Sequence, residues 1–131
     1  MNFIYLGIEE VYSIHEALIK AGGGRANVRD FTLLHSSVER PKVTFGGKFL
    51  YPTLWLQAGA LMQSLVMNHP FTDGNKRTGF YSTKRFLYIN GYDLVYTKAE
   101  AYDFCLAVDN EDLKVETIAK WLEKHSRKIT V

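Results

Sequence analysis

Leu54 to Asn68, LWLQAGALMQSLVMN, is the stretch that decides the fold. It is long and mostly apolar, and its apolar residues recur at helical spacing, at Leu54, Ala58, Leu61 and Leu65. A helix that is apolar over most of its surface belongs in the middle of a protein. We therefore expect one central helix, with the other elements packed around it.

Five more helices are predicted, which makes the fold mainly α with about six helices. They cover residues 8–21, 30–40, 75–90, 97–108 and 113–125. Gly22-Gly23-Gly24 stops the first of them, and Asp30 is a plausible N-cap for the second. Thr97 and Glu100 form a T-x-x-E capping box. With no repeat and no linker, residues 1–131 are expected to form a single compact domain.

Residues 43–51, VTFGGKFLY, have a different pattern. Two short runs that favour β-structure flank Gly46-Gly47, which predicts a small β-hairpin. An isolated β-hairpin is only marginally stable, so we expect this one to pack against the helical body. Residues 93–96 are a candidate for a short extended piece.

Composition limits the function classes. Apolar residues make up 47% of the chain and charged residues 23%, as in a globular protein. There is no membrane-length apolar run and no secretory signal, so we expect a cytoplasmic protein without a membrane partner. The single cysteine, Cys105, excludes an internal disulfide and should be buried. A net charge of +2 and the lack of a helix-turn-helix pattern disfavour direct nucleic-acid binding. The basic residues near the C-terminus are expected to favour a helix end and then a solvated tail.

The segment rich in chemistry is His69 to Thr78, HPFTDGNKRT. Pro70 disfavours helical geometry at His69, so the central helix should end there. Gly74 permits a tight turn, and 75–77 begin a helix whose first N–H groups lack partners at its positive end. Such a helix start, with Lys and Arg inside it, predicts an anion site, and phosphate is the obvious ligand.

The side chains of this segment suit phosphoryl transfer. His69 can take a proton from an attacking hydroxyl, and Asp73 can hold Mg²⁺ or orient that hydroxyl. Arg77 offers a planar fork of donors and Lys76 a compact charge. Phe71 has no chemical task and should anchor the loop in the core. Two other interpretations stay open: an ordinary polar loop between helices, and a metal site of a hydrolase, for which no second histidine stands nearby.

The segment resembles the signature of the Fic/Doc superfamily, and Lys76 resembles its death-on-curing branch. Similarity extends over Phe3 to His125. It includes Tyr5-Leu6, Ile14-His15, Arg29-Asp30, Glu39-Arg40-Pro41, Phe45-Gly46-Gly47, Leu50-Tyr51-Pro52, Asn68-His69-Pro70, Phe86-Leu87, Asn90-Gly91-Tyr92 and Trp121-Leu122. The resemblance implies a compact helical fold with the motif loop at its centre.

The resemblance also implies roles for residues. His69 would be the catalytic base, Asp73 the Mg²⁺-linked or hydroxyl-orienting acid, and Arg77 a catalytic phosphate ligand. The nucleotide's phosphates would be bound by Gly74, Asn75, Lys76, Arg77 and Thr78. A hairpin flap beside the site would align the target by strand addition, through Phe45, Gly46, Gly47, Lys48 and Phe49.

Members of the family that transfer AMP usually carry glycine at the position of Lys76 and arginine at that of Phe80. Lysine-bearing relatives are kinases that phosphorylate a threonine of elongation factor Tu. The resemblance therefore favours a kinase toxin that uses ATP or another nucleoside triphosphate with Mg²⁺, ahead of an AMP transferase or a non-catalytic module with the same fold. No self-inhibiting S/T-x-x-x-E-G/N segment is present, so a separate small antitoxin is expected to restrain it.

Two departures from relatives lie outside the motif, at Gln57 in the central helix and at Ala26-Asn27-Val28. They could change the choice of antitoxin or target without changing the chemistry. His15, beside the apolar face of the first helix, is expected to be a satisfied core or boundary residue.

Overall fold

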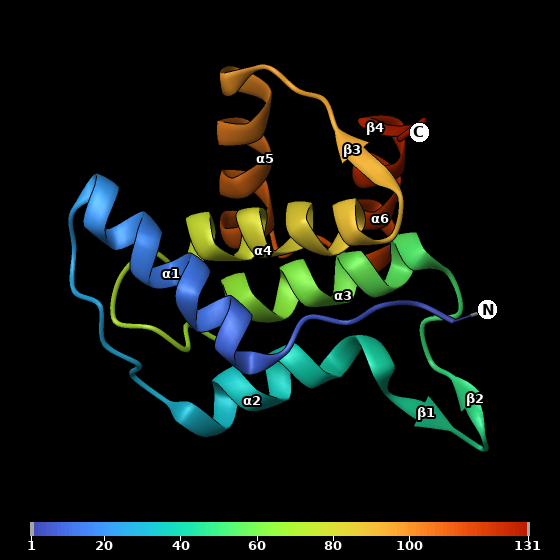
Figure 1. Cartoon of the computed structure of the whole chain (residues 1–131), viewed down its shortest axis with the longest axis horizontal. Coiled ribbons are helices and arrows are strands. Elements are labelled where there is room, and N and C mark those ends of the chain that lie inside the picture. Colours follow the sequence, from blue (N-terminus) through green and yellow to red (C-terminus); the bar gives the residue numbers. More distant parts are fainter. Residues whose placement is uncertain (1, 131) are drawn as a thin grey trace.

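The chain folds into six α-helices and two small antiparallel sheets in the computed structural model, which describes residues 2–130 (Figure 1). The helices are α1 (Ile8–Gly22), α2 (Phe31–Glu39), α3 (Leu54–Met67), α4 (Asn75–Ile89), α5 (Lys98–Asn110) and α6 (Val115–Lys124). A short 3-10 helix, Arg40–Lys42, follows α2. The predicted mainly α fold is confirmed, and so are the caps: Asp30 accepts from the amide of Leu33, and Thr97 and Glu100 cap each other's backbone.

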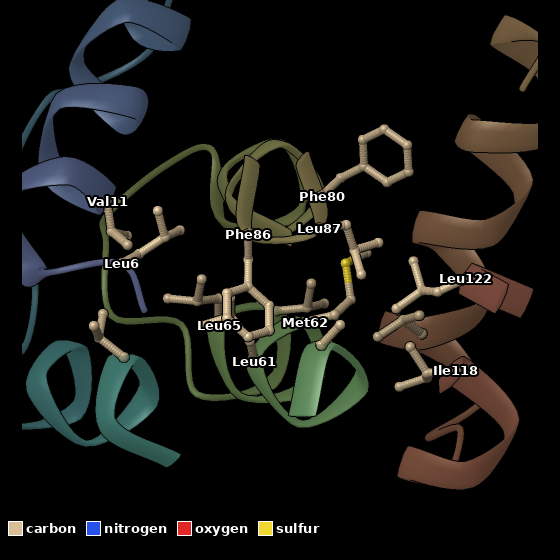
Figure 2. Packing of buried hydrophobic residues seen from close by; sticks show 14 of the residues in the cluster. Leu6, Val11, Leu61, Met62, Leu65, Phe80, Phe86, Leu87, Ile118 and Leu122 are labelled. Carbon is tan, nitrogen blue, oxygen red and sulfur yellow. The ribbon is translucent and has the colours of Figure 1, made fainter. Parts of the chain in front are cut away.

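Helix α3 is the centre of the molecule, as its sequence predicts. It packs along α4 on one side and α6 on another (Figure 1). Phe86 of α4 points at Leu61 and Leu65 of α3 in the core (Figure 2). Gly59 lets α3 and α6 come close, because an added Cβ there would lie 2.9 Å from the carbonyl oxygen of Val115.

The predicted hairpin forms from β1 (Thr44–Phe45) and β2 (Lys48–Phe49). Gly46 and Gly47 join the strands with φ values of 59° and 79°, which glycine adopts without strain. The hairpin is exposed along its length, and Phe45 is 83% exposed. The hairpin therefore packs against the helical body less than we expected from the sequence.

The short extended piece expected at residues 93–96 forms in part, one residue earlier, but its pairing into a second sheet was not predicted. β3 (Tyr92–Leu94) pairs with β4 (Ser126–Lys128), and Asp93 lies opposite Arg127. Arg127 and Lys128 are exposed, as expected of a solvated basic segment, but their backbone is held in a strand and not in a tail. Three-residue strands are too short to show an alternating pattern, and each is defined only by a partner far away in the chain. No helix within residues 2–130 is long and apolar enough to cross a membrane.

Candidate active site

The motif loop joins the end of α3 to the start of α4 and is fixed by the segment that precedes α2. The amides of Arg29 and Asp30 both donate to the carbonyl of Pro70, at 2.8 and 3.1 Å. The amide of Thr72 donates to the carbonyl of Asn27 at 3.0 Å. These contacts form a short β-like ladder, so the loop is tied to the fold by its backbone.

His69 is held in an unusual backbone conformation. Its φ of 48° is rare for a residue with a side chain. The Arg29 guanidinium donates to the carbonyls of His69, at 2.6 Å, and Asn68, at 3.0 Å. Backbone strain of this kind persists where surrounding contacts enforce it. Arg29 therefore fixes the turn that leaves the imidazole half exposed.

The start of α4 is open. Gly74 adopts a left-handed conformation (φ 78°, ψ 21°), and no side chain of residues 2–130 caps this helix end. By contrast, side chains of Asp30, Thr53 and Thr97 cap α2, α3 and α5. The first amides of α4 thus lack helical partners at the positive end of its dipole. This geometry can bind an anion.

Two of the predicted phosphate ligands have side chains that serve the loop or the core. Asn75 donates to the carbonyl of Phe71 and accepts from the amide of Phe71, both at 2.9 Å and both buried. Thr78 is fully buried, and its hydroxyl has no partner among residues 2–130. Asn75 can therefore offer an anion only its backbone amide. Phe71 is buried, as predicted.

Asp73 is oriented from two directions. Its Oδ2 accepts from the amide of Arg25 at 2.8 Å, and its backbone carbonyl accepts from Nε2 of His15 at 2.7 Å. His15 is completely buried and stacks on Phe71 with ring centroids 3.7 Å apart. Burial lowers the pKa of His15, and its hydrogen bond to Asp73 opposes the shift. The sequence predicted a satisfied core or boundary residue. His15 is indeed in the core, but its Nδ1 has no partner among residues 2–130, and its contact with the motif was not predicted.

The side chain of Arg77 ties the motif to α1. Its guanidinium donates to the carbonyls of Leu18 and Gly23, each at 3.3 Å. Gly22 leaves space for this group, because an added Cβ there would collide with Nη1 of Arg77. The predicted phosphate ligand thus lies at the C-terminal end of α1, next to the motif loop.

Lys76 and His69 share a partner that sequence patterns did not reveal. Oδ2 of Asp109, on α5, lies 3.2 Å from Nζ of Lys76, and its Oδ1 lies 3.9 Å from Nε2 of His69. Asp109 follows the motif by more than thirty residues, so no spacing rule could have found it. Cys105, one helical turn earlier, is half-buried, and burial raises the pKa of its thiol to about 11.

A protein-built metal cluster is absent from residues 2–130, where no three His, Cys, Asp or Glu side chains gather. The loop still fits an ion that a nucleotide would share. Asp73 is fixed through Oδ2, and its Oδ1 makes no hydrogen bond to any residue in 2–130. Mg²⁺ commonly uses one or two carboxylates plus phosphate oxygens and water.

The hairpin does not lie beside the motif loop, contrary to the expectation for a flap. It precedes α3, whereas the motif follows α3, and Figure 1 shows the two at opposite ends of that helix. A helix of 14 residues spans about 20 Å. The local pattern predicted the hairpin, but its place depends on how α2 and α3 pack.

A mainly apolar groove of about 680 Å³ runs between α1 and α4. Its walls include Ile14, Ala17 and Leu18 from α1, and Tyr81 and Tyr88 from α4. Leu18 is also the residue whose carbonyl accepts from Arg77. The groove is therefore built from the helices that hold the motif loop.

Comparison with known proteins identifies the family. A family model described as the Fic/DOC family matches residues 5–87, which include the whole motif. Toxin Doc of Mycolicibacterium smegmatis is 40% identical over 114 residues, covering 82% of this chain and 88% of that protein. Both matches confirm the resemblance carried by HPFTDGNKRT.

Proposed function

Because the chain belongs to the Fic/DOC family, whose members are transferases, we propose that it is a Doc-type toxin that transfers a phosphoryl group from a nucleoside triphosphate to a protein hydroxyl. The observation that carries this proposal is the open, positive start of α4, placed directly after the loop that presents His69. A donor phosphate on the helix amides would lie close to the base.

In the proposed reaction, the target hydroxyl oxygen attacks the γ-phosphorus. A new P–O bond forms, and the bond from the γ-phosphorus to the bridging oxygen breaks. The nucleoside diphosphate leaves with that electron pair, and the hydroxyl proton passes to the ring of His69. The helix start, Lys76 and Arg77 stabilise negative charge on the phosphates, which is the main requirement of phosphoryl transfer.

Asp73 would hold Mg²⁺ together with the phosphates, and the ion would neutralise part of their charge. The amide of Arg25 and the ring of His15 keep Asp73 in place for this task. Its orientation therefore does not depend on the nucleotide.

Lys76 and Phe80 favour γ-phosphoryl transfer over AMP transfer. Phe80 is 3% exposed and packs edge-on against Tyr96 and Phe104, so this position supplies no second cation to a nucleotide. Lys76 supplies charge where AMP-transferring relatives have glycine. We propose a translation factor such as elongation factor Tu as the target, which presents its hydroxyl at the motif loop.

The test compares ATP labelled at the γ-phosphate with ATP labelled at the α-phosphate, using the chain, Mg²⁺ and purified elongation factor Tu. Label from the γ position supports the kinase, and label from the α position would establish AMP transfer instead. His69→Ala should lower the rate by about 10²–10⁴-fold, because general-base catalysis is lost. The half-exposed side chain of His69 contributes little packing, so the variant should fold normally. Growth inhibition by His69→Ala equal to that of the wild type would refute a catalytic toxin.

We also propose that a small antitoxin places an amphipathic helix in the groove between α1 and α4. The groove is mainly apolar and lies between two helices, which suits recognition of a helix by its apolar face. Lys84 and Arg85 of α4 and Glu9 and Glu10 of α1 also line the groove, so a helix with charges of both signs on its flanks would match it. Antitoxin binding there would act on the helices that hold the motif loop.

A further inference from the structure

We propose that Asp109 is a positioning residue for the transfer reaction, acting by fixing the ammonium group of Lys76 beside His69. This inference rests on the proposed function. It concerns a residue of α5 that lies outside the motif, and it explains how a flexible lysine can serve a defined site.

The geometry is that of a bridge between the base and the cation. One carboxylate oxygen of Asp109 lies 3.2 Å from Nζ of Lys76, and the other lies 3.9 Å from Nε2 of His69. The side chain of Asp109 is 20% exposed, against 44% for Lys76 and 52% for His69. The acid is thus the most shielded of the three groups, and water screens its pair with lysine less than it would a fully exposed pair.

A second observation places Lys76 against α5. The charge of Lys76 lowers the pKa of the Cys105 thiol, in opposition to the larger effect of burial. Cys105 and Asp109 are four residues apart and so lie on the same face of α5. The ammonium group of Lys76 is therefore directed toward that face of α5.

The negative charge of Asp109 allows a positioning role to be distinguished from direct attraction of the nucleotide. A carboxylate next to bound phosphates repels them, so it weakens nucleotide binding by its own field. An acid at this place can improve the reaction by holding Lys76 where the transition state needs it, since a lysine without a partner samples many rotamers. Its contact with His69 is a second route, and a Lys76→Met background separates the two. Loss of the charge should therefore lower kcat without raising the KM for nucleotide.

The experiment measures kcat and nucleotide KM for the full chain, with whichever label the wild type transfers. Asp109→Asn should lower kcat about tenfold or more while KM stays within about threefold or falls. Asp103→Asn is the matched control, because Asp103 is exposed on the same helix and makes no ion pair among residues 2–130. It should leave both constants within about twofold. Asp109→Glu keeps the charge and should restore part of kcat.

A double-mutant cycle tests the route through lysine. In a Lys76→Met background, Asp109→Asn should cost less than about threefold in kcat, because the group it positions is gone. An unchanged kcat in Asp109→Asn, or the same tenfold loss with and without Lys76, would overturn the inference while leaving the proposed function intact. A wild type that transfers no label would overturn both. If Asp109→Asn fails to fold, kcat for Asp109→Glu with and without Lys76 decides in the same way.

Discussion

Asn75 shows how a motif residue can act through the backbone it holds. Its side-chain amide donates to the C=O of Phe71 and accepts from the N–H of Phe71, and these two buried hydrogen bonds close a ring. Asn75→Ala would leave those two groups without partners, so the free energy of unfolding should fall by roughly 2–4 kcal/mol. Urea denaturation would measure it, with the exposed Asn110→Ala as control. A loss below about 1 kcal/mol, similar to the control, would contradict the ring's importance.

His15 should make stability depend on pH. Burial lowers its pKa below the ordinary 6.5, so between the two values the unfolded chain binds a proton that the folded chain does not. Its contribution to stability is therefore complete above about pH 7 and is lost as the pH falls through 6.5. In His15→Gln this loss should be absent. Urea unfolding at several pH values would measure the difference in the free energy of unfolding between the wild type and His15→Gln. This difference should decrease as the pH falls. A difference that stays constant with pH would contradict the prediction.

At the scale of elements, the contact between α3 and α6 depends on Gly59. A Cβ at this position would lie 2.9 Å from the carbonyl oxygen of Val115, and that backbone atom cannot move aside easily. Gly59→Ala should destabilise the fold by about 1–3 kcal/mol, although alanine favours helices. Ser13→Ala is the comparison, because Ser13 is exposed within α1 and an alanine there replaces a side chain of similar size. Urea denaturation should show the larger loss at Gly59, and equal losses would refute the explanation.

Among the elements, the sequence predicts those features that depend on residues close together in the chain. Helix starts at Asp30 and Thr97 follow from caps made within one turn, and the Gly46-Gly47 turn follows from positive φ. The pairing of β3 with β4, the place of the hairpin and the Asp109–Lys76 pair all join distant segments. The spacing of residues in a single sequence does not encode such contacts. The motif was therefore predictable, but most of the contacts that hold it in place were not.

At the scale of the whole molecule, the groove and the motif loop share α1 and α4. A positive charge in the groove should block an apolar helix without disturbing the fold, because Ala17 is exposed. Ala17→Arg should weaken antitoxin binding by about 100-fold, since an unpaired charge is desolvated. The control Glu16→Arg changes the neighbouring exposed residue, which does not line the groove. Calorimetric titration with the antitoxin decides, and equal affinities for the two variants would rule out this docking site.

The environment of Cys105 has a practical consequence for spectroscopy. It is the chain's one cysteine, and with a pKa of about 11 only about one thiol in ten thousand is ionised at pH 7. Maleimide dyes should therefore react slowly with Cys105 and much faster with a cysteine introduced at Phe45 on the exposed hairpin. A fluorophore attached there would report any contact between the hairpin and a partner protein in real time, without removal of the native sulfur.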